Sequence, residues 1–259
     1  MSADKHIPTG AEAVKPYNAG GAKTEQVKEM FDSIAPAYDF MNTAMSFGLH
    51  RHWRNRAIGM ATEALRRNGM VSPSEVLDVA TGTGDVAIEL ARRYKEAHIT
   101  GIDLSKGMLE IARRKVGSRP ARSRMDFEVG DCLALRWAPD TFDLITVAYG
   151  VRNFERLEQG YAEMARVLRS GGVLCVVELS QPENRLCLAG YNLYSRHIIP
   201  LVGRFVSGDS RAYTYLPESI AAAPQRGDMT ALMERAGLRQ AVWKSLTFGA
   251  VTIYTAVKP

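Results

Sequence analysis

Residues 75–93 read EVLDVATGTGDVAIELARR. An apolar run that carries one acidic residue breaks at Gly82 and Gly84, and a helical pattern follows without a linker. A strand that turns through glycines into a helix lets a bound group approach the backbone closely. The stretch therefore predicts a nucleotide-binding strand–loop–helix unit. It leaves open whether the ligand is a dinucleotide, a phosphate or a nucleoside.

The chain beyond this stretch continues to alternate strands with helices. The run GVLCVVEL at 172–179 is apolar throughout, which is typical of a strand buried on both faces of a parallel sheet. The last two strands, 240–248 and 250–257, are separated only by Gly249, so we expect them to pair antiparallel. The pattern predicts an α/β, doubly wound, mostly parallel seven-stranded sheet with an antiparallel C-terminal hairpin. The other strands are expected at 75–80, 98–103, 125–130 and 142–148, and helices at 85–97, 105–116, 157–168 and 225–237.

Length and composition are those of one α/β domain. The chain has 259 residues, of which 46% are hydrophobic and 24% charged, as in ordinary globular proteins. Residues 1–22 show no periodicity and predict a mobile arm, followed by a single domain at 23–259. Within that domain we expect N-terminal helices at 24–70. We also expect a long, apolar and aromatic insertion at 181–217, of the kind that often forms a lid.

The net charge of +5 and the pI near 9.1 suit an anionic membrane surface, a polyanion or an ordinary basic enzyme. The basic residues are spread out, so no nucleic-acid partner is predicted. The absence of a long apolar run and of a secretory pattern at the N-terminus predicts a cytoplasmic protein. The three cysteines have no metal-ligand spacing, and His50 with His52 lacks further ligands nearby. No metal site is predicted.

The glycine loop alone does not identify its ligand. Residues 82–87 satisfy G-x-G-x-x-A, and the acidic Asp103 follows about 20 residues after the loop at a strand end. A carboxylate at that position accepts hydrogen bonds from ribose hydroxyls. This arrangement serves a nicotinamide dinucleotide and S-adenosylmethionine equally well.

Three further features favour S-adenosylmethionine. Asp78 precedes the loop, where its carboxylate would repel a pyrophosphate and attract a sulfonium or ammonium group. Asp131 follows the third strand, where a side chain can meet an adenine edge. The terminal antiparallel hairpin is foreign to ordinary dinucleotide folds. Each aspartate could also be a common strand-end cap, but three of them around one glycine loop favour a ligand site.

Several stretches of the chain resemble the ubiquinone/menaquinone biosynthesis C-methyltransferase family over residues 24–257. Two of them are specific to that family, VKEMFDSIAPAYDFMNTAMSFGLHRHWR at 27–54 and YTYLPESI at 213–220. The resemblance also rests on LDVATGTGD at 77–85, which many methyltransferases share, on YGVRNFERLEQGYAEMARVLRSGG at 149–172, and on VVELSQP at 176–182. It implies a Rossmann-like class I methyltransferase fold and S-adenosyl-L-methionine as the cofactor.

The resemblance also implies cofactor contacts at Thr83, at Asp103, and at Asp131 with Cys132. One departure is Ala148, where the family often has a serine, so a hydroxyl contact to the cofactor is lost or replaced there. The complete set of predicted cofactor-binding residues is Asp78, Ala80, Gly82, Thr83, Gly84, Asp103, Leu104, Met108, Asp131, Cys132 and Ala148.

The activity implied by the resemblance is methyl transfer to a ring carbon of a polyprenylated quinol, with demethylmenaquinol as the main expectation. The alternatives are C-methylation of a benzoquinol in ubiquinone synthesis and another small-molecule methyltransferase. From other classes, an NAD-dependent oxidoreductase and a non-catalytic partner that kept the cofactor pocket remain open. Thermal-shift titration with S-adenosylmethionine against NAD would separate the methyltransferase from the oxidoreductase.

Quinol methylation requires a group that stabilises the phenolate, since only the phenolate pushes strong electron density onto the ring carbon. The candidates are Arg152 for the charge and Asn153 for orientation, both just past the fourth parallel strand. Tyr38 and Glu178 are weaker candidates. The alternative for Arg152 is a surface ion pair with Glu155.

The apolar insertion at 181–217 suits a substrate with a hydrophobic tail. One interpretation is a channel for a prenyl tail, with arginines toward lipid head groups, which would place the enzyme peripherally at the inner face of the membrane. A dimerisation surface of a homodimer, or a helix packed on the core, is an equal alternative. The residues concerned are Leu193, Tyr194, Ile198, Ile199, Leu201 and Phe205 for the channel, and Arg196, Arg204 and Arg211 for the head groups.

Overall fold

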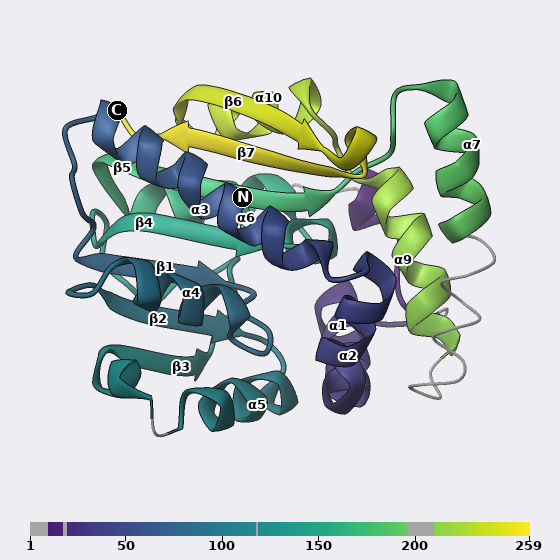
Figure 1. Cartoon of the computed structure of the whole chain (residues 1–259), viewed down its shortest axis with the longest axis horizontal. Helices are drawn as coiled ribbons and strands as arrows, with labels where there is room; N and C mark the ends of the chain where they lie inside the picture. The colour runs from purple at the N-terminus through teal and green to yellow at the C-terminus, as the bar shows by residue number, and fades with distance from the viewer. Residues whose placement is uncertain (1–9, 18–19, 118, 196–209) are drawn as a thin grey trace, which may run out of the picture.

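The computed structural model describes residues 10–17, 20–117, 119–195 and 210–259, and its centre is a seven-stranded sheet (Figure 1). The order of the strands is β3-β2-β1-β4-β5-β7-β6. Strands β1 to β5 pair in parallel, whereas β7 is antiparallel to both β5 and β6. The predicted parallel sheet with its antiparallel hairpin is thereby confirmed. The strands are β1 Glu75–Val79, β2 His98–Asp103, β3 Met125–Val129, β4 Phe142–Ala148, β5 Leu168–Leu179, β6 Arg239–Leu246 and β7 Val251–Val257.

Helices cover both faces of the sheet, as strands with two buried faces require. Helices α3, α4 and α5 lie on one face and α6 and α10 on the other (Figure 1). The α-helices are α1 Lys23–Ile34, α2 Tyr38–Ser46, α3 Leu49–Arg67, α4 Asp85–Arg93, α5 Lys106–Val116, α6 Leu157–Val167, α7 Arg185–Leu193, α9 Ser210–Ala222 and α10 Gly227–Arg235. Short 3-10 helices are η1 Gly10–Glu12, η2 Ala35–Ala37, η3 Pro120–Arg124, η4 Val151–Asn153 and η6 Thr247–Gly249.

The alternation of side chains along each strand builds one core on each face. In β1, Leu77 belongs to the cluster under α6 and α10, whereas Val76 belongs to the cluster under α3 and α4. Both side chains are fully buried. This double burial explains why the strands read as continuous apolar runs.

The carboxyl ends of the parallel strands all point to one edge of the sheet, and the N-terminal helices α1 and α2 lie just beyond it (Figure 1). A third apolar cluster joins these helices to the edge, with Met30 from α1, Met41 from α2, Met108 from α5 and Tyr215 from α9. The ends of the strands therefore face a roof of helices rather than open solvent.

The expectation of a mobile arm at 1–22 does not hold for residues 10–17. Ala11 is fully buried, and Glu12 Oε1 accepts a hydrogen bond from Leu157 N at 2.7 Å, at the start of α6. Lys23 Nζ donates to the carbonyl oxygen of Ala11. A few specific polar contacts fix this segment, and such contacts leave no periodicity in a sequence.

Helix α2 lies within the range 24–70 in which N-terminal helices were expected, and Pro36 lies in η2 just before it, where a proline is tolerated in the first turn of a helix. Two other elements differ from the sequence-based expectation. Strand β5 begins at Leu168, directly after α6, rather than at Gly172. The structure places α7 and the first part of α9 within 181–217, and α9 continues past Pro217 to Ala222. The predicted channel residues Ile198, Ile199, Leu201 and Phe205, and Arg196 with Arg204, lie outside the described residues.

Candidate functional site

A cavity lies at the carboxyl ends of β1 to β4. This is where ligands bind in open parallel sheets. The structure brings together there most of the predicted cofactor residues, namely Ala80, Gly82, Asp103, Leu104, Met108, Asp131, Cys132 and Ala148. We call this cavity the cofactor pocket.

Asp103 is the best-defined polar group of the cofactor pocket. Its Oδ2 accepts a hydrogen bond from Gly82 N at 2.8 Å, and its Oδ1 accepts one from Ser105 N at 2.9 Å. Burial raises the pKa of Asp103 to about 6, although these amides oppose the shift. Each carboxylate oxygen has further lone-pair capacity with which to accept ligand hydroxyls.

Apolar side chains and two more acidic residues, Asp131 and Glu155, complete the pocket. Asp131 Oδ1 accepts from Leu133 N at 2.9 Å, which fixes the loop after β3. Met108 is buried beside Leu104. Burial raises the pKa of the Cys132 thiol well above its ordinary value, so that the sulfur stays protonated. The pocket thus combines acidic groups with an apolar slot that suits a nucleobase such as adenine.

Asp78 lies below the glycine loop rather than in the cofactor pocket. Its carboxylate is 1% exposed and accepts from Thr81 Oγ1 and Thr146 Oγ1, both at 2.6 Å. Burial raises the pKa of Asp78 to about 6. The side chain holds the shape of the loop through Thr81, and it lines a neighbouring cavity instead.

Gly84 and Thr83 also serve the loop rather than line the cofactor pocket. Gly84 has a φ of +80°, and a Cβ there would lie 2.9 Å from the Cβ of Ala112 on α5. The hydroxyl of Thr83 donates to Asp39 Oδ1 at 2.6 Å and accepts from Lys115 Nζ at 2.9 Å. The glycine permits close packing of the loop on α5, and the threonine ties the loop to α2.

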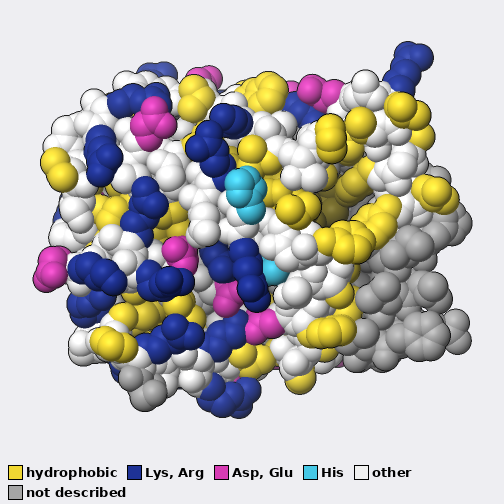
Figure 2. Space-filling model, viewed as in Figure 1, with side chains coloured by type: hydrophobic (Ala, Val, Ile, Leu, Met, Phe, Trp, Pro, Cys, Tyr) yellow, Lys and Arg dark blue, Asp and Glu magenta, His cyan; other side chains and the backbone are white. Residues whose placement is uncertain are grey.

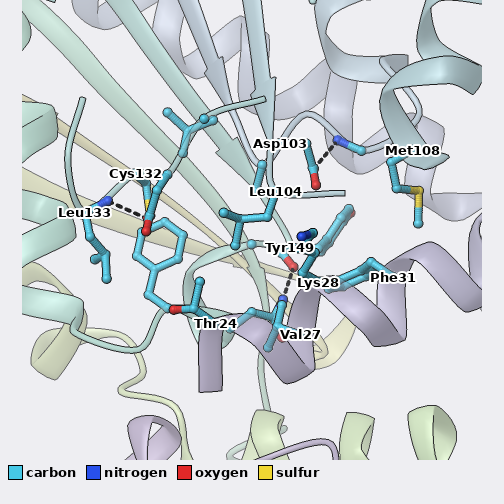
Figure 3. A pocket seen from close by; sticks show the side chains of 18 of the residues that line it. Thr24, Val27, Lys28, Phe31, Asp103, Leu104, Met108, Cys132, Leu133 and Tyr149 are labelled. Carbon is cyan, nitrogen blue, oxygen red and sulfur yellow. Dashed lines mark hydrogen bonds between the residues drawn. The ribbon is translucent and has the colours of Figure 1, made fainter. Parts of the chain in front are cut away.

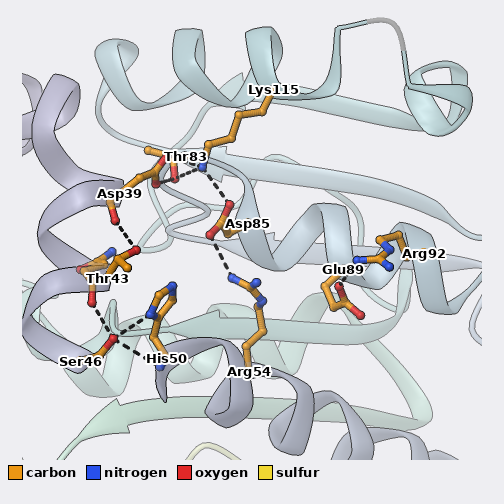
Figure 4. A network of polar contacts seen from close by, with 11 residues as sticks. Asp39, Thr43, Ser46, His50, Arg54, Thr83, Asp85, Glu89, Arg92 and Lys115 are labelled. Carbon is orange, nitrogen blue, oxygen red and sulfur yellow. Dashed lines mark hydrogen bonds and ion pairs between the residues drawn. The ribbon is translucent and has the colours of Figure 1, made fainter. Parts of the chain in front are cut away.

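That threonine belongs to a polar network that joins four elements (Figure 4). Lys115 of α5 pairs with Asp39 of α2 at 2.6 Å and with Asp85 of α4 at 2.8 Å. Arg54 of α3 contacts Asp85 at 3.0 Å. Burial acts to raise the pKa of Asp85, but Lys115 and Arg54 outweigh it and hold the pKa below its ordinary value. The network fastens α2 to the glycine loop.

Helix α1 forms the roof of the cofactor pocket. Its residues Thr24, Val27, Lys28 and Phe31 line the pocket, across from Leu104, Cys132 and Leu133 (Figure 3). Glu155 fixes the start of the helix, because its Oε2 accepts from Thr24 N at 3.1 Å and from Thr24 Oγ1 at 2.6 Å. A bound molecule there would contact one face of α1.

A second, larger cavity adjoins the first. It is bounded by α2, α3, α7 and α9. Figure 2 shows hydrophobic side chains around a hollow in the right-hand part of the face, where this cavity opens. The two cavities share Phe31, Tyr38, Ala80, Gly82, Ala148 and Tyr149. We call the second one the substrate cavity, because it joins the cofactor pocket at these residues.

Arg152 lines the substrate cavity and forms a buried ion pair. Its Nη1 lies 2.6 Å from Glu178 Oε1 and 2.5 Å from the carbonyl oxygen of Tyr149. The alternative pairing with Glu155 is wrong, because Glu155 instead binds Thr24. Arg152 and Glu178 are 6% and 1% exposed, so this pair is shielded from water.

Asn153 and Tyr38 both line the cofactor pocket. Asn153 Oδ1 accepts from the hydroxyl of Tyr215 at 3.0 Å, and its side chain lines the cofactor pocket. Tyr38 lines both cavities. Burial raises the pKa of Tyr38, so its hydroxyl stays neutral. The structure therefore brings Tyr38, Arg152 and Asn153 to the junction of the cavities, with Glu178 behind Arg152.

Two buried polar atoms at this junction have no hydrogen-bond partner among the described residues, the hydroxyl of Tyr149 and Nε of Arg152. Tyr149 follows β4 with a φ of +58°, an uncommon conformation for a residue with a side chain. Buried polar groups are nearly always satisfied, and such strain concentrates at ligand sites. Both features indicate that a polar ligand group is received here.

The sequence pattern did not reveal several residues of the site. Nothing in the periodicity of α1 distinguishes a roof helix from an ordinary core helix, so Thr24 and Lys28 were missed. Tyr149 was quoted in the YGVRNF motif, and its place before Arg152 was the available signal. Among the described residues, no three His, Cys, Asp or Glu side chains gather in a way that could hold a metal ion.

The amino-acid sequence matches the model of the ubiE/COQ5 methyltransferase family over residues 20–258. It is 45% identical to the demethylmenaquinone methyltransferase of Porphyromonas gingivalis, over 95% of this chain and 98% of that protein. It is 43% identical to the protein of the same name from Deinococcus radiodurans, over 96% of this chain and 99% of that one. The ubiquinone/menaquinone biosynthesis C-methyltransferase UbiE of Geobacter sulfurreducens is 40% identical, over 91% and 90%.

Solved structures share the fold at lower identity. The complex of the Haloferax volcanii Trm112 methyltransferase activator with a methyltransferase contains a chain that superposes with a TM-score of 0.59 and 18% identity, over 88% of this chain and 97% of that one. Phosphoethanolamine N-methyltransferase 2 of Haemonchus contortus, in complex with S-adenosyl-L-methionine, gives a TM-score of 0.55 and 14% identity, over 78% and 52%. The expected Rossmann-like class I methyltransferase fold is thereby confirmed.

Proposed function

The chain belongs to the ubiE/COQ5 methyltransferase family, and from this premise we propose that it methylates a ring carbon of a polyprenylated quinol. Demethylmenaquinol is the main substrate, as the names of the relatives from Porphyromonas gingivalis and Deinococcus radiodurans suggest. The observation that carries the proposal is the large, largely apolar cavity that opens into the cofactor pocket at Tyr38 and Tyr149.

The cofactor pocket fits S-adenosyl-L-methionine. Asp103 offers a carboxylate to ribose hydroxyls, and Leu104 and Met108 offer an apolar slot for the adenine base. Asp131 and Glu155 add negative charge that favours a cation over a pyrophosphate. When bound, this cofactor supplies an electrophilic methyl group on a sulfonium, and the protein has to align it with the ring and exclude water.

The residues at the junction have distinct proposed roles. Arg152 supplies the positive charge that stabilises the phenolate. Its Nε, which has no hydrogen-bond partner among the described residues, would donate a hydrogen bond to the phenolate oxygen. Glu178 is a positioning residue, since its carboxylate holds Nη1 of Arg152. Asn153 and Tyr38 orient the ring at the point where the two cavities meet.

The experiment that tests the function uses the purified chain and S-adenosylmethionine with a labelled methyl group. Incubation with demethylmenaquinol, and in parallel with a demethylated benzoquinol, is followed by mass spectrometry of the extracted quinols. We expect label on the naphthoquinol ring. Label on the benzoquinol alone would move the assignment to ubiquinone synthesis, a role that the name of the Geobacter sulfurreducens relative includes. No label on either ring would contradict the proposal.

Asp103 gives cofactor binding a pH dependence. Only the ionised carboxylate can accept from both amides and from a ligand hydroxyl, and burial raises its pKa from 3.8 to about 6. We expect the affinity for S-adenosylmethionine to fall as the pH drops through about 6. Because the folded-state pKa is raised, the contribution of Asp103 to the free energy of unfolding is fully present below pH 3.8. That contribution is lost as the pH rises toward about 6.

Isothermal titration calorimetry between about pH 5 and about pH 8 measures this dependence. The variant Asp103→Asn is the control, because its amide does not titrate. It should bind weakly at every pH. An unchanged pH dependence in this variant would assign the effect to another group.

We also propose that the mouth of the substrate cavity contacts a lipid surface, since the proposed substrate carries a polyprenyl tail. No helix in the described part of the chain is both long and apolar enough to cross a membrane. Exposed apolar side chains lie on several elements that line the cavity, and we call five of them the apolar rim. They are Phe47 and Leu49 of α2–α3, Leu186 and Leu193 of α7, and Phe248 of η6.

The two phenylalanines of the apolar rim stand out. Each is 82% exposed and has a positive φ, +50° at Phe47 and +55° at Phe248. Exposed cationic side chains are close to the rim in the chain, with Arg51 two residues after Leu49 and Arg185 directly before Leu186. Aromatic side chains with neighbouring positive charge suit the interface of an anionic bilayer.

Co-sedimentation with vesicles of phosphatidylcholine and phosphatidylglycerol tests this contact. We expect the double variant Phe47→Ser, Phe248→Ser to lose binding at least tenfold, because each phenylalanine contributes about 2 kcal/mol when buried in lipid. Val71→Ser, at an exposed apolar side chain away from the cavity, is the matched control. If the wild-type chain ignores vesicles but forms a dimer that the double variant abolishes, the rim is a homodimer interface instead.

A further inference from the structure

The reaction proposed above needs a group that takes a proton from the quinol, and His50 is placed to do this. His50 lies in the first turn of α3 and lines the substrate cavity with Ser46 and Arg54. Its ring contacts Ser46 through Nδ1 (Figure 4). What the ring can do depends on which nitrogen carries the hydrogen.

The hydrogen bonds of Ser46 settle that question. Its hydroxyl lies 2.6 Å from the carbonyl oxygen of Asn42, which can only accept, so the single hydroxyl proton of Ser46 is used there. The contact of 2.7 Å between Ser46 Oγ and His50 Nδ1 must then have Nδ1–H as the donor. In the neutral ring, Nε2 therefore carries a free lone pair.

Burial and two nearby arginines favour the neutral ring of His50. Burial is the main cause that lowers its pKa below the ordinary value, and Arg54 and Arg51 of α3 act in the same direction. Asp85 of α4 and Asp39 of α2 oppose the shift without reversing it. The ring is thus able to accept a proton near neutral pH.

Other titratable side chains that line the substrate cavity are less suitable within the described residues. Arginines stay protonated. Asp78 already accepts from two threonine hydroxyls, and Asp85 is paired with Lys115 and Arg54. Burial raises the pKa of each tyrosine of the cavity, so none is a phenolate near neutral pH; these are Tyr38, Tyr149, Tyr191, Tyr194 and Tyr215.

We propose that Nε2 of His50 accepts the proton of the quinol hydroxyl next to the ring carbon that is methylated. This inference rests on the proposed function. The O–H bond breaks, its electron pair stays on oxygen, and the imidazole becomes an imidazolium. The ring carbon then bonds to the methyl group while the methyl–sulfur bond breaks and leaves its electron pair on sulfur. Loss of the ring hydrogen to water and return of the proton from His50 to oxygen complete the turnover, with one proton released.

The test begins with the hydrogen position, which needs no turnover. Nitrogen NMR of the chain labelled at histidine, without substrate, should show His50 with hydrogen on Nδ1 and none on Nε2. The resonance is assigned by its absence from His50→Asn. In Ser46→Ala, which removes the acceptor for Nδ1–H, we expect a mixture of the two neutral tautomers, some rings with hydrogen on Nδ1 and others with hydrogen on Nε2. A wild-type ring protonated on Nε2 alone would overturn the proposal.

Kinetics of His50→Asn then test the proton transfer. Its amide can still donate toward Ser46, but it offers no Nε2. We expect kcat to fall about 100-fold or more, the usual loss when a general base is removed. The KM for the quinol and the affinity for S-adenosylmethionine should stay nearly unchanged, and the acidic limb of the pH profile that reports His50 should disappear.

His52→Asn is the matched control, because His52 is exposed two residues farther along the same helix. It should turn over as the wild type does. Normal turnover of His50→Asn would overturn the role of His50 while the proposed function stands. If the wild-type chain methylates no quinol, the proposed function is contradicted. The NMR measurement would still show which nitrogen of His50 carries the hydrogen.

Discussion

Replacing Arg152 by alanine is expected to slow methyl transfer by about 100-fold or more, as removal of one group that stabilises an oxyanion does. It should also lower the free energy of unfolding by about 3–5 kcal/mol, because the carboxylate of Glu178 would remain buried without its partner. For a chain of this length that loss corresponds to a fall in Tm of about 10 °C. Stopped assays and differential scanning calorimetry measure the two effects.

A double variant separates catalysis from stability. In Arg152→Met with Glu178→Met, no charge is left buried alone, so most of the stability should return while turnover stays low. The affinity for S-adenosylmethionine should change little in either variant, because Arg152 lines the substrate cavity and not the cofactor pocket. Arg156→Ala, at an exposed arginine four residues on, serves as the control. Full activity of the double variant would show that Arg152 has no part in the reaction.

Replacing Asp103 by alanine is expected to weaken binding of S-adenosylmethionine by about 100-fold or more. The change removes the acceptor for Gly82 N and Ser105 N and the proposed acceptor for the ribose hydroxyls. Hydrogen bonds to a charged group are worth about 1.5–3 kcal/mol each, and about 1.4 kcal/mol is tenfold in affinity. Calorimetric titration near neutral pH gives the value.

Asp126→Ala is the control for this variant. Asp126 lies on the neighbouring strand β3 and pairs with His98 at the surface, so its loss should leave affinity unchanged. Wild-type affinity in Asp103→Ala would mean that the ribose is held elsewhere and would remove Asp103 from the site. A loss of helical signal or a large drop in Tm would point to collapse of the loop instead.

The sheet could be predicted from the sequence because its strands are buried on both faces. A strand that is buried on both faces has a continuous apolar run in its sequence, as within 172–179. The glycines at 82 and 84 mark the turn into α4. The strand that ends at Asp103 and the strand that precedes Asp131 were predicted correctly, and both residues line the cofactor pocket. These features depend on residues that are close together in the chain, so the sequence pattern is enough to predict them.

The contacts that could not be predicted join residues far apart in the chain. Glu178 rather than Glu155 pairs with Arg152, although Glu155 is only three residues away, because Arg152 lies in the 3-10 helix η4, from which its guanidinium reaches β5. Asp39 meets Lys115 only because α2 folds back over the glycine loop. His50 was considered only as a metal ligand, since its hydrogen bond to Ser46 belongs to the geometry of the α2–α3 turn.

The division of the site into two cavities has a consequence for the order of binding. The cofactor pocket lies under α1, whereas the substrate cavity is bounded by α2, α3, α7 and α9. Each reactant has space of its own, so the methyl donor and the quinol can be held at the same time. We therefore expect direct transfer within a ternary complex, with no methylated enzyme in between.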